Sequence, residues 1–364
     1  MVKIKDIMNF LEEIAPLSYQ EDYDNSGLIV GDETQELKGI LVCLDSTEEV
    51  IDEAINHRYN LVIAHHPIIF GGLKKITGSN YVERAIIKAI KQDIAVYAIH
   101  TNLDNVKQGV NKKIAEMLDL VDPEILSPGQ NKLMKLVTFI PKTHTDQVLE
   151  KIHQAGAGKI GDYDHCSFRV NGTGRFKPGE NADPYIGTKD LLEEVNEDRV
   201  EVIFPAFKKN EVLAAMNDSH PYEEVAYYLH ELANLSGDTG SGMIGNLQNE
   251  MQPLEFLDFL KKKMSLNSVR YTPSKKGIKK VAVCGGAGSF LLPKAIKSGA
   301  DVFITADMKY HDFFDGDGKT MIIDIGHYES EQFTKELIYG LLSKKFSNIA
   351  LRLSEVNTNP IRYI

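Results

Sequence analysis

The sequence has no tryptophan and only three cysteines among its 364 residues. Cys43, Cys166 and Cys284 lie far apart and form no Cys-x-x-Cys pair, which argues against a disulfide-stabilised secreted protein. Cys43 and Cys284 lie within apolar runs that are typical of buried strands. We therefore expect buried free thiols and a cytoplasmic location, where thiols stay reduced.

Basic residues and long apolar runs are also scarce. Lysine and arginine number 41 against 52 aspartates and glutamates, which gives a formal net charge of -11. Non-specific nucleic-acid binding needs a basic face, so this balance argues against a nucleic-acid partner. No apolar run approaches the roughly 20 residues of a membrane span. Residues 1–17 contain Asp6, Glu12 and Glu13, so they predict an amphipathic helix and not a signal peptide.

Strand and helix patterns alternate along most of the chain. In the N-terminal part, the patterns predict strands at 39–45, 61–66 and 94–100 and helices at 46–60, 81–92 and 105–120. Near the C-terminus, they predict strands at 279–286, 301–307 and 319–327 and helices at 289–299 and 330–346. Strands alternating with helices of about 10–15 residues indicate βαβ units and a parallel sheet, so the fold class is α/β.

These two series resemble each other in hydrophobic pattern and spacing, with few identities. Residues 39–66 match 279–307, and residues 95–105 match 321–331. We therefore predict two similar βαβ half-domains that form one discontinuous parent domain from residues 1–128 and 236–364. Two such halves would face each other and place their strand ends in one shared cleft.

The middle of the chain, residues 129–235, does not fit this repeat. Its pattern runs strand, helix, hairpin, strand, helix, strand, which is close to the ferredoxin-like arrangement. The predicted hairpin spans residues 165–178 and turns at Asn171-Gly172. Turn-rich segments flank the region, at 126–131 and 235–242, as domain boundaries do. We predict an inserted α+β domain.

Two adjacent histidines, His65 and His66, follow the apolar run 61–64. Pro67 cannot donate to a sheet ladder, so the strand should end there and leave both imidazoles at its carboxyl end. In open α/β sheets this edge is where ligands bind. Taken alone, the pair fits a metal site and two structural histidines about equally well.

Two further segments place a carboxylate four residues after a histidine, again beyond a predicted strand. They carry His100 with Asp104, and His327 with Glu331, at matching places in the two series. Each acidic residue has a simpler reading: Asp104 as a helix N-cap and Glu331 as a charge in a helix's first turn. The coincidence of three strand ends favours a metal site, and imidazole with carboxylate suits zinc, iron or manganese.

The set His65, His66, Asp104, His327 and Glu331 is too small for two separate closed sites. It suffices for a dinuclear centre in which one carboxylate bridges, and Asp104, with its short side chain, is the favoured bridge. Each ion would keep open positions for water, as catalytic sites do. A metal-bound hydroxide is a strong nucleophile near neutral pH.

Weaker candidates lie near other strand ends. The segment 284–289, CGGAGS, could bind phosphate at a helix N-terminus, but it lacks the P-loop lysine and a tight turn is favoured. Asp307, Lys309 and His311 follow another strand and could contact substrate or act as acid and base. With Asn25 in the turn-rich segment 23–31, they are our candidate substrate-binding residues.

The segments IAHHPIIF, HTNLDN, TADMKYHD, IDIGHYESEQ and YDNSGLIVG together resemble the Ngg1-interacting-factor-like family, also called GTP cyclohydrolase 1 type 2 homologues. The resemblance covers both halves of the predicted parent domain. It implies a dinuclear metal centre on His65, His66, Asp104, His327 and Glu331, and a toroidal homohexamer. It also implies that the inserted domain is similar to the PII and CutA-type domains of longer members.

The family name implies hydrolytic opening of the imidazole ring of GTP. We therefore expect a small-molecule substrate, with a nucleotide as the first candidate. His100 is the candidate for proton transfer in such a reaction. The broader expectation is a metal-dependent hydrolase with two divalent ions, zinc first and iron or manganese as alternatives. The competing hypothesis is a metal-binding regulatory or adaptor protein whose insert senses a small molecule.

Overall fold

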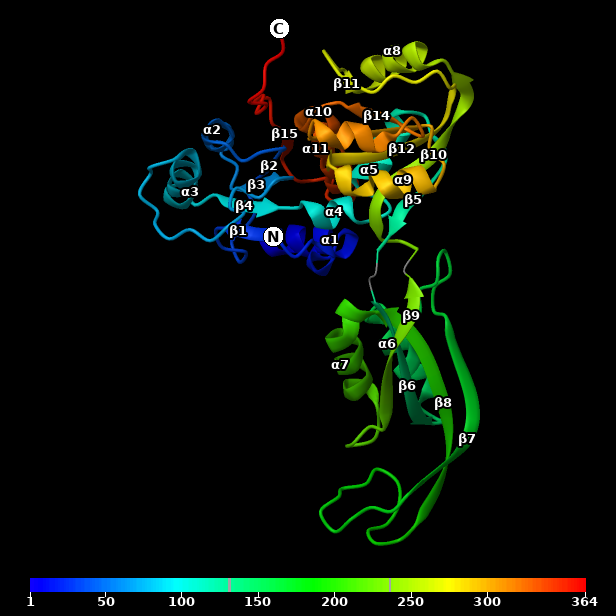
Figure 1. Cartoon of the computed structure of the whole chain (residues 1–364). Helices are drawn as coiled ribbons and strands as arrows, with labels where there is room; N and C mark the ends of the chain where they lie inside the picture. The colour runs from blue at the N-terminus through cyan, green and yellow to red at the C-terminus, as the bar shows by residue number, and fades with distance from the viewer. Residues whose placement is uncertain (130–131, 236) are drawn as a thin grey trace. The chain divides into compact units, whose positions relative to one another are not determined.

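The computed structural model of the chain describes residues 1–129, 132–235 and 237–364 and contains two compact units (Figure 1). Unit 1 consists of Met1–Pro128 and Asp238–Ile364, and unit 2 is Gly129–Gly237. The fold is mixed α/β, and the strands of the described residues form three sheets, two in unit 1 and one in unit 2.

The first sheet of unit 1 has the order β1-β4-β3-β2-β15. Its strands are β1 (Gly27–Val30), β2 (Ile40–Cys43), β3 (Leu61–Ala64), β4 (Ala95–Ala98) and β15 (Leu351–Leu353). β2, β3 and β4 run parallel, β15 is parallel to β2, and β1 is antiparallel to β4. All four residues of β3 are buried, because helices α2 (Glu48–His57) and α3 (Tyr81–Lys91) pack on one face and a larger core on the other.

The second sheet of unit 1 has the order β11-β14-β13-β12-β10-β5. Its strands are β5 (Val121–Pro128), β10 (Gly240–Met251), β11 (Arg270–Tyr271), β12 (Ile278–Ala287), β13 (Val302–Ala306) and β14 (Met321–Asp324). β12, β13 and β14 run parallel, as β2, β3 and β4 do. The connecting elements are shorter than in the first sheet: η3 (Ser289–Leu291), α9 (Leu292–Lys297) and η4 (His311–Gly316).

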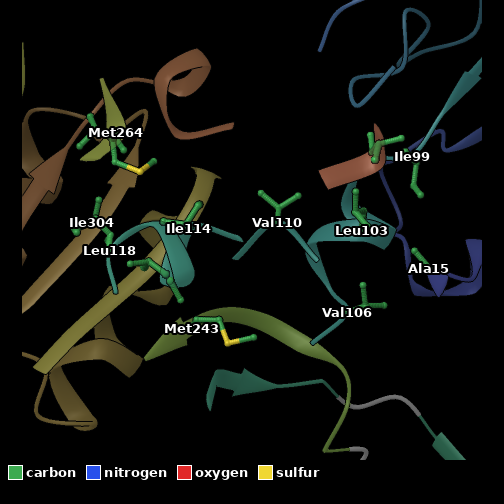
Figure 2. Close-up of a cluster of buried hydrophobic side chains, with 14 of the residues drawn as sticks. Ala15, Ile99, Leu103, Val106, Val110, Ile114, Leu118, Met243, Met264 and Ile304 are labelled. Carbon is green, nitrogen blue, oxygen red and sulfur yellow. The ribbon is translucent and has the colours of Figure 1, made fainter. Parts of the chain in front are cut away.

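One hydrophobic core joins the two sheets (Figure 2). Helices α1 (Ile4–Ile14), α8 (Pro253–Met264) and α11 (Thr334–Lys345) contribute to it, together with α5 (Val110–Met117). Val110 and Ile114 of α5 pack with Leu103 of the first half and Met243 of the second. Because this core holds both halves in one unit, the carboxyl ends of β3, β4 and β14 are fixed relative to one another.

Unit 2 is built from β6 (Lys132–Pro141), α6 (Thr145–Gln154), β7 (Ser167–Phe176), β8 (Glu193–Pro205), η2 (Ala206–Lys208), α7 (Lys209–Ser219) and β9 (Tyr227–Leu235). Its antiparallel sheet has the order β7-β8-β6-β9. The helices α6 and α7 pack on one sheet face around Leu136, Val148 and Phe204.

Three local expectations were wrong. β7 is one continuous strand with no turn at Asn171-Gly172, because Asn171 pairs with Asp198 and Gly172 with Glu197 along β8. Residues 126–128, which were expected to lie in a turn-rich boundary segment, belong to strand β5, because β5 pairs with β10. The helix expected at 105–120 begins only at Val110.

Asp104 is therefore no N-cap of that helix. It is the last residue of a short helix, α4 (Thr101–Asp104), while Gly109 caps α5. The expectation of free cysteines is confirmed, with Cys43 and Cys284 buried. Over the described parts of the chain, every helix is too short or too polar to cross a membrane.

Candidate metal centre

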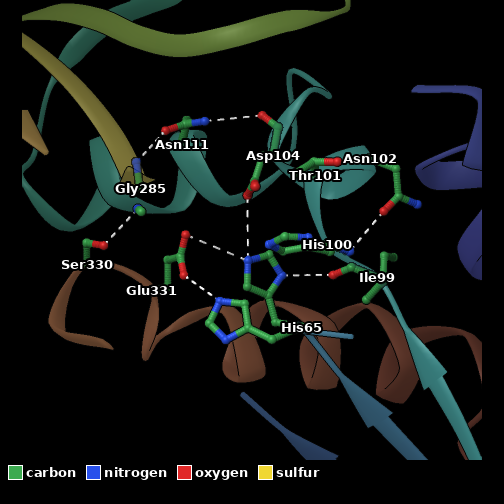
Figure 3. Close-up of polar contacts among 12 residues, drawn as sticks. His65, Ile99, His100, Thr101, Asn102, Asp104, Asn111, Gly285, Ser330 and Glu331 are labelled. Carbon is green, nitrogen blue, oxygen red and sulfur yellow. Dashed lines mark hydrogen bonds and ion pairs between the residues drawn. The ribbon is translucent and has the colours of Figure 1, made fainter. Parts of the chain in front are cut away.

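The candidate ligands converge at the strand ends of unit 1. Figure 3 shows three of them, His65, Asp104 and Glu331, near one another. His65 and His66 directly follow β3, and Asp104 closes α4 after β4. His327 and Glu331 are the first and last residues of α10 (His327–Glu331), which follows β14 of the second sheet. Four-residue spacing on one helical turn brings His327 Nε2 within 3.1 Å of Glu331 Oε2.

His65 presents one ring nitrogen with no hydrogen-bond partner. Its Nδ1 lies 2.8 Å from the carbonyl oxygen of Ile99, which can only accept, so Nδ1 is the donor. The buried Nε2 then faces Asp104 Oδ1 at 3.7 Å and Glu331 Oε1 at 3.9 Å, too far for hydrogen bonds. His65 Nε2 and Asp104 Oδ1 are both buried without a partner. Since buried polar atoms are almost always satisfied, this arrangement fits a metal ion.

His66 and His327 each have a carboxylate behind the ring. Asp45 Oδ1 accepts from His66 Nδ1 at 2.8 Å, and Asp307 Oδ2 accepts from His327 Nδ1 at 2.6 Å. Both rings direct Nε2 to Glu331 Oε2, His66 at 2.9 Å. A carboxylate that orients a ligating imidazole is a common feature of metal sites. Sequence reasoning missed Asp45 and treated Asp307 as a substrate contact.

His65, His66 and His100 form one of three possible ligand groups among the described residues. Of the two carboxylates, Glu331 and not Asp104 is common to the other two groups. These groups are His65, Asp104 and Glu331, and His66, His327 and Glu331. Gly286 makes room for this carboxylate, because a Cβ there would lie 2.5 Å from Glu331 Oε1. The backbone N–H groups of Gly285, Gly286 and Gly288 donate to Asn111, Ser330 and Thr305. Residues 284–287 are the end of β12, so the expectation of a tight turn at 284–289 is wrong. The three N–H donors already have side-chain partners and are not free for phosphate.

The electrostatics of the cluster match its geometry. Burial, with the nearby Glu331 carboxylate, raises the pKa of Asp104 to about 7. Burial also opposes ionisation of Glu331, but hydrogen bonds from His327 and His66 and the nearby ring of His65 hold its pKa well below the ordinary value. Burial opposes the charged form of His66 too, yet Asp45 and Glu331 raise its pKa to about 10. Cationic character is thus concentrated beside a buried carboxylate pair.

His100 lies beside these residues, with its ring centroid 5.2 Å from that of His65. Asp24, whose side chain is fully buried, accepts from His100 Nδ1 at 2.7 Å. The other Asp24 oxygen accepts from the Thr101 backbone N–H at 3.0 Å and from the Ser26 hydroxyl at 3.0 Å. Burial opposes ionisation of Asp24, but these partners hold its pKa well below the ordinary value. Asp24 was missed, and only its place in the turn-rich segment 23–31 could have drawn attention to it.

The candidate substrate residues have other roles or positions. Asn25 donates from Nδ2 to the carbonyl oxygen of Ile69 and so fixes the loop after β3. Asp307 is taken by His327. Lys309 and His311 are exposed and lie outside the lining of the cavity that opens at the cluster. That cavity has a volume of about 520 Å³ and includes His66, His100 and His327 in its walls.

Comparison with known proteins identifies the family. The profile described as Duf34/NIF3 (NGG1p interacting factor 3) matches residues 2–360. The chain belongs to this family. A Bacillus subtilis relative named GTP cyclohydrolase 1 type 2 homolog is 40% identical over 367 residues, 99% of this chain and 98% of the relative. A relative of the same name from Halalkalibacterium halodurans is 42% identical over 365 residues, 98% of each chain.

The fold of this Duf34/NIF3 chain is also similar to solved structures. The crystal structure of a Bacillus cereus protein related to NIF3 matches with a TM-score of 0.88 and 37% identity, and covers 100% of this chain and 99% of that one. A Staphylococcus aureus protein, SA1388, matches with a TM-score of 0.79 and 34% identity over 100% and 99% of the two chains. The family resemblance expected from the sequence motifs is thus confirmed.

Proposed function

We propose that this protein is a dinuclear metal-dependent hydrolase. One ion would be held by His65, Asp104 and Glu331, and the other by His66, His327 and Glu331. The observation that carries the proposal is the pair of buried, unpartnered atoms, His65 Nε2 and Asp104 Oδ1, beside a carboxylate that contacts both groups. The donors are nitrogen and oxygen atoms, which suits zinc, with iron or manganese as alternatives.

A pair of divalent ions supplies hydroxide near neutral pH by lowering the pKa of bound water. The chain's own residues would then orient the reactants and move protons. His100 is the proposed proton-transfer residue, since its Nδ1 is held by Asp24 and its ring faces His65 and His66. Asp24 fixes the tautomer that leaves Nε2 of His100 free for this role.

The relatives' name suggests the reaction to test first, the hydrolytic opening of the imidazole ring of GTP. The experiment compares metal-loaded protein with the variants Asp104→Ala and His66→Ala on a panel of nucleotides and phosphoesters. We expect each variant to lose about 100-fold or more in rate while it keeps its circular dichroism spectrum. A wild-type protein that carries two ions and hydrolyses nothing on the panel would count against a hydrolase.

We further propose that unit 2 is an inserted ferredoxin-like domain, because its element order and its sheet order β7-β8-β6-β9 follow that arrangement. The proposed assembly is a homohexamer in the cytoplasm. Light scattering of the full chain tests the assembly.

A regulatory function is the second candidate, and a cavity of about 670 Å³ within unit 2 favours it. Its walls combine Tyr222, Tyr228 and Arg199 with the carboxylate of Glu197, which accepts from the Tyr222 hydroxyl at 2.8 Å. Full-length protein should bind a small metabolite there, and Tyr222→Ala should abolish binding. A screen of metabolites by calorimetry that finds no binding would remove this candidate.

A further inference from the structure

The cavity at the proposed metal centre is suited to one class of substrate by its charge. Its volume of about 520 Å³ is within the range of small-molecule sites. Within residues 1–129, 132–235 and 237–364, neither lysine nor arginine lines it. Carboxyl groups line it instead, and they are Glu21, Asp45, Asp104 and Glu331.

Arg362 is the basic residue that follows the last lining residue in the sequence, and its guanidinium already has hydrogen-bond partners. Ile361 lines the cavity, and the next residue is Arg362. The guanidinium of Arg362 donates to the carbonyl oxygens of Asn359 and Ile361, so it stabilises the C-terminal segment itself. Among the described residues, no lysine or arginine side chain therefore offsets the carboxylates of the cavity wall.

The two proposed ions would not give the cavity a net positive charge. Four lining carboxylates balance two divalent cations, so a polyphosphate would enter a cavity without net positive charge. Sites for phosphate groups ordinarily offer arginine, lysine or free backbone N–H groups. The N–H groups of Gly285 and Gly286, which line the cavity, already have side-chain partners. If the reacting ring lies at the ions, a triphosphate attached to it meets no lysine or arginine among the described lining residues.

Aromatic side chains in the lining can attract a planar ring by stacking. Tyr23, Phe70, Tyr81 and Phe290 line the cavity and are 70%, 56%, 59% and 64% exposed. Exposed aromatic faces beside a cavity gain contact area by stacking on a planar ligand. The lining therefore favours a planar, uncharged molecule over a highly anionic one.

We propose that the substrate is an uncharged planar nitrogen heterocycle, a purine base or a nucleoside without phosphates, whose ring carbon–nitrogen bond is hydrolysed. This rests on the hydrolase function proposed above and narrows it. The step consumes one water: its oxygen bonds to the ring carbon and becomes a carbonyl oxygen, and one carbon–nitrogen bond breaks. One water proton goes to the nitrogen that is released and the other to the nitrogen that stays bonded to the carbon. Neither an oxidant nor a reductant is needed.

The test is calorimetric titration of the metal-loaded, full-length protein with guanosine, GMP and GTP. Guanosine should bind most tightly and GTP about tenfold more weakly, since each added phosphate increases repulsion. GTP binding equal to or tighter than guanosine binding overturns the inference, and so does the absence of binding by all three. Hydrolysis of guanosine is followed separately by chromatography of the same mixture, so bound guanosine that is not hydrolysed contradicts the hydrolase function alone.

Two matched pairs of variants test the two causes separately. Phe290→Ala should weaken guanosine binding about fivefold, whereas Phe314→Ala, which removes an equally exposed ring outside the cavity, should not. Ile361→Lys should raise the affinity for GTP relative to guanosine about fivefold, whereas Ile76→Lys, at an equally exposed site outside the lining, should not. Equal effects within either pair would contradict the proposal.

Discussion

The two sheets of unit 1 share a topology and differ in chemistry. β2, β3 and β4 are parallel and adjacent in that order, and so are β12, β13 and β14. Two imidazoles, His65 and His66, follow the middle strand of the first sheet, whereas Asp307 follows the middle strand of the second. Both third strands lead into a short helix that carries a carboxylate, Asp104 or Glu331.

The same arrangement of parallel strands thus places candidate metal ligands at some strand ends and carboxylates that orient these ligands at others. In the first sheet, Asp45 at the end of β2 orients His66 of the same sheet. In the second, Asp307 at the end of β13 orients His327. Among the candidate ligands, Glu331 is the carboxylate that reaches imidazoles of both sheets. The second sheet thus contributes fewer candidate ligands but the one carboxylate on which both proposed ions depend.

The largest effect should come from Glu331→Ala. Because Glu331 belongs to both ligand groups, we expect the variant to retain fewer than one of the two proposed ions and to lose about 1000-fold in activity. Elemental analysis after dialysis measures the ions. Glu336→Ala, which removes a half-exposed carboxylate on the following helix, is the control and should retain both. Retention of both ions by Glu331→Ala would contradict the shared role.

Asp24→Asn tests the hydrogen bond between Asp24 and His100, which follows β4 of the first sheet. The carboxamide can present its N–H to His100 Nδ1 and disturb the tautomer, so kcat should fall about 100-fold with metal content unchanged. Asp22→Asn, at an exposed position two residues away, serves as the control. Loss of metal together with activity would instead make Asp24 a support of the metal centre.

Asp45→Asn and Asp307→Asn compare the two orienting carboxylates directly. Asp45 is less exposed, 35% against 53%, and also accepts from the Thr358 hydroxyl. We expect Asp45→Asn to weaken metal affinity by about 10–100-fold and Asp307→Asn by about 10-fold or less. Competition with a chromogenic chelator measures both. A larger effect at Asp307 would show that His327 depends more on its support than His66 does.

The smallest expected effect is a change in stability. It concerns Glu83, which holds the loop after β3. Glu83 accepts from the backbone N–H groups of Thr77 and Ser79, and these bonds lower its pKa from 4.5 to about 2. The contribution of ionised Glu83 to the free energy of unfolding is therefore full above about pH 4.5 and is lost as the pH falls toward 2.

Glu83→Gln should lower the Tm by a few degrees at pH 7, and the difference from wild type should shrink between pH 4.5 and pH 3. Thermal unfolding followed by circular dichroism measures this. Glu116→Gln, which changes an exposed carboxylate, is the control. A difference that does not depend on pH would mean that Glu83 acts through its shape and not its charge.

The sequence predicted the parts of the cluster that depend on short-range geometry. His65 and His66 could be found because Pro67 ends a short apolar strand, and His327 with Glu331 because their spacing spans one helical turn. The supports could not be found in this way. Asp24 lies 76 residues before His100, and Asp45 lies 21 before His66, so only the folded chain pairs them.

The missed strands have the same cause. β5, β10 and β15 join sheets through pairing with distant segments, and their own sequences carry weak strand signals. At Asn171-Gly172 the local turn signal was strong, but pairing with β8 overrides it. Gly174 in the same strand is required by packing, because a Cβ there would lie 2.0 Å from Glu197 Oε2.

The most direct test of the dinuclear centre is a crystal structure of the metal-loaded protein with anomalous scattering data. We predict two anomalous peaks per chain, one beside His65, Asp104 and Glu331 and the other beside His66, His327 and Glu331, with Glu331 close to both. A single peak, or a second peak away from His66 and His327, would contradict a dinuclear centre assembled from both sheets.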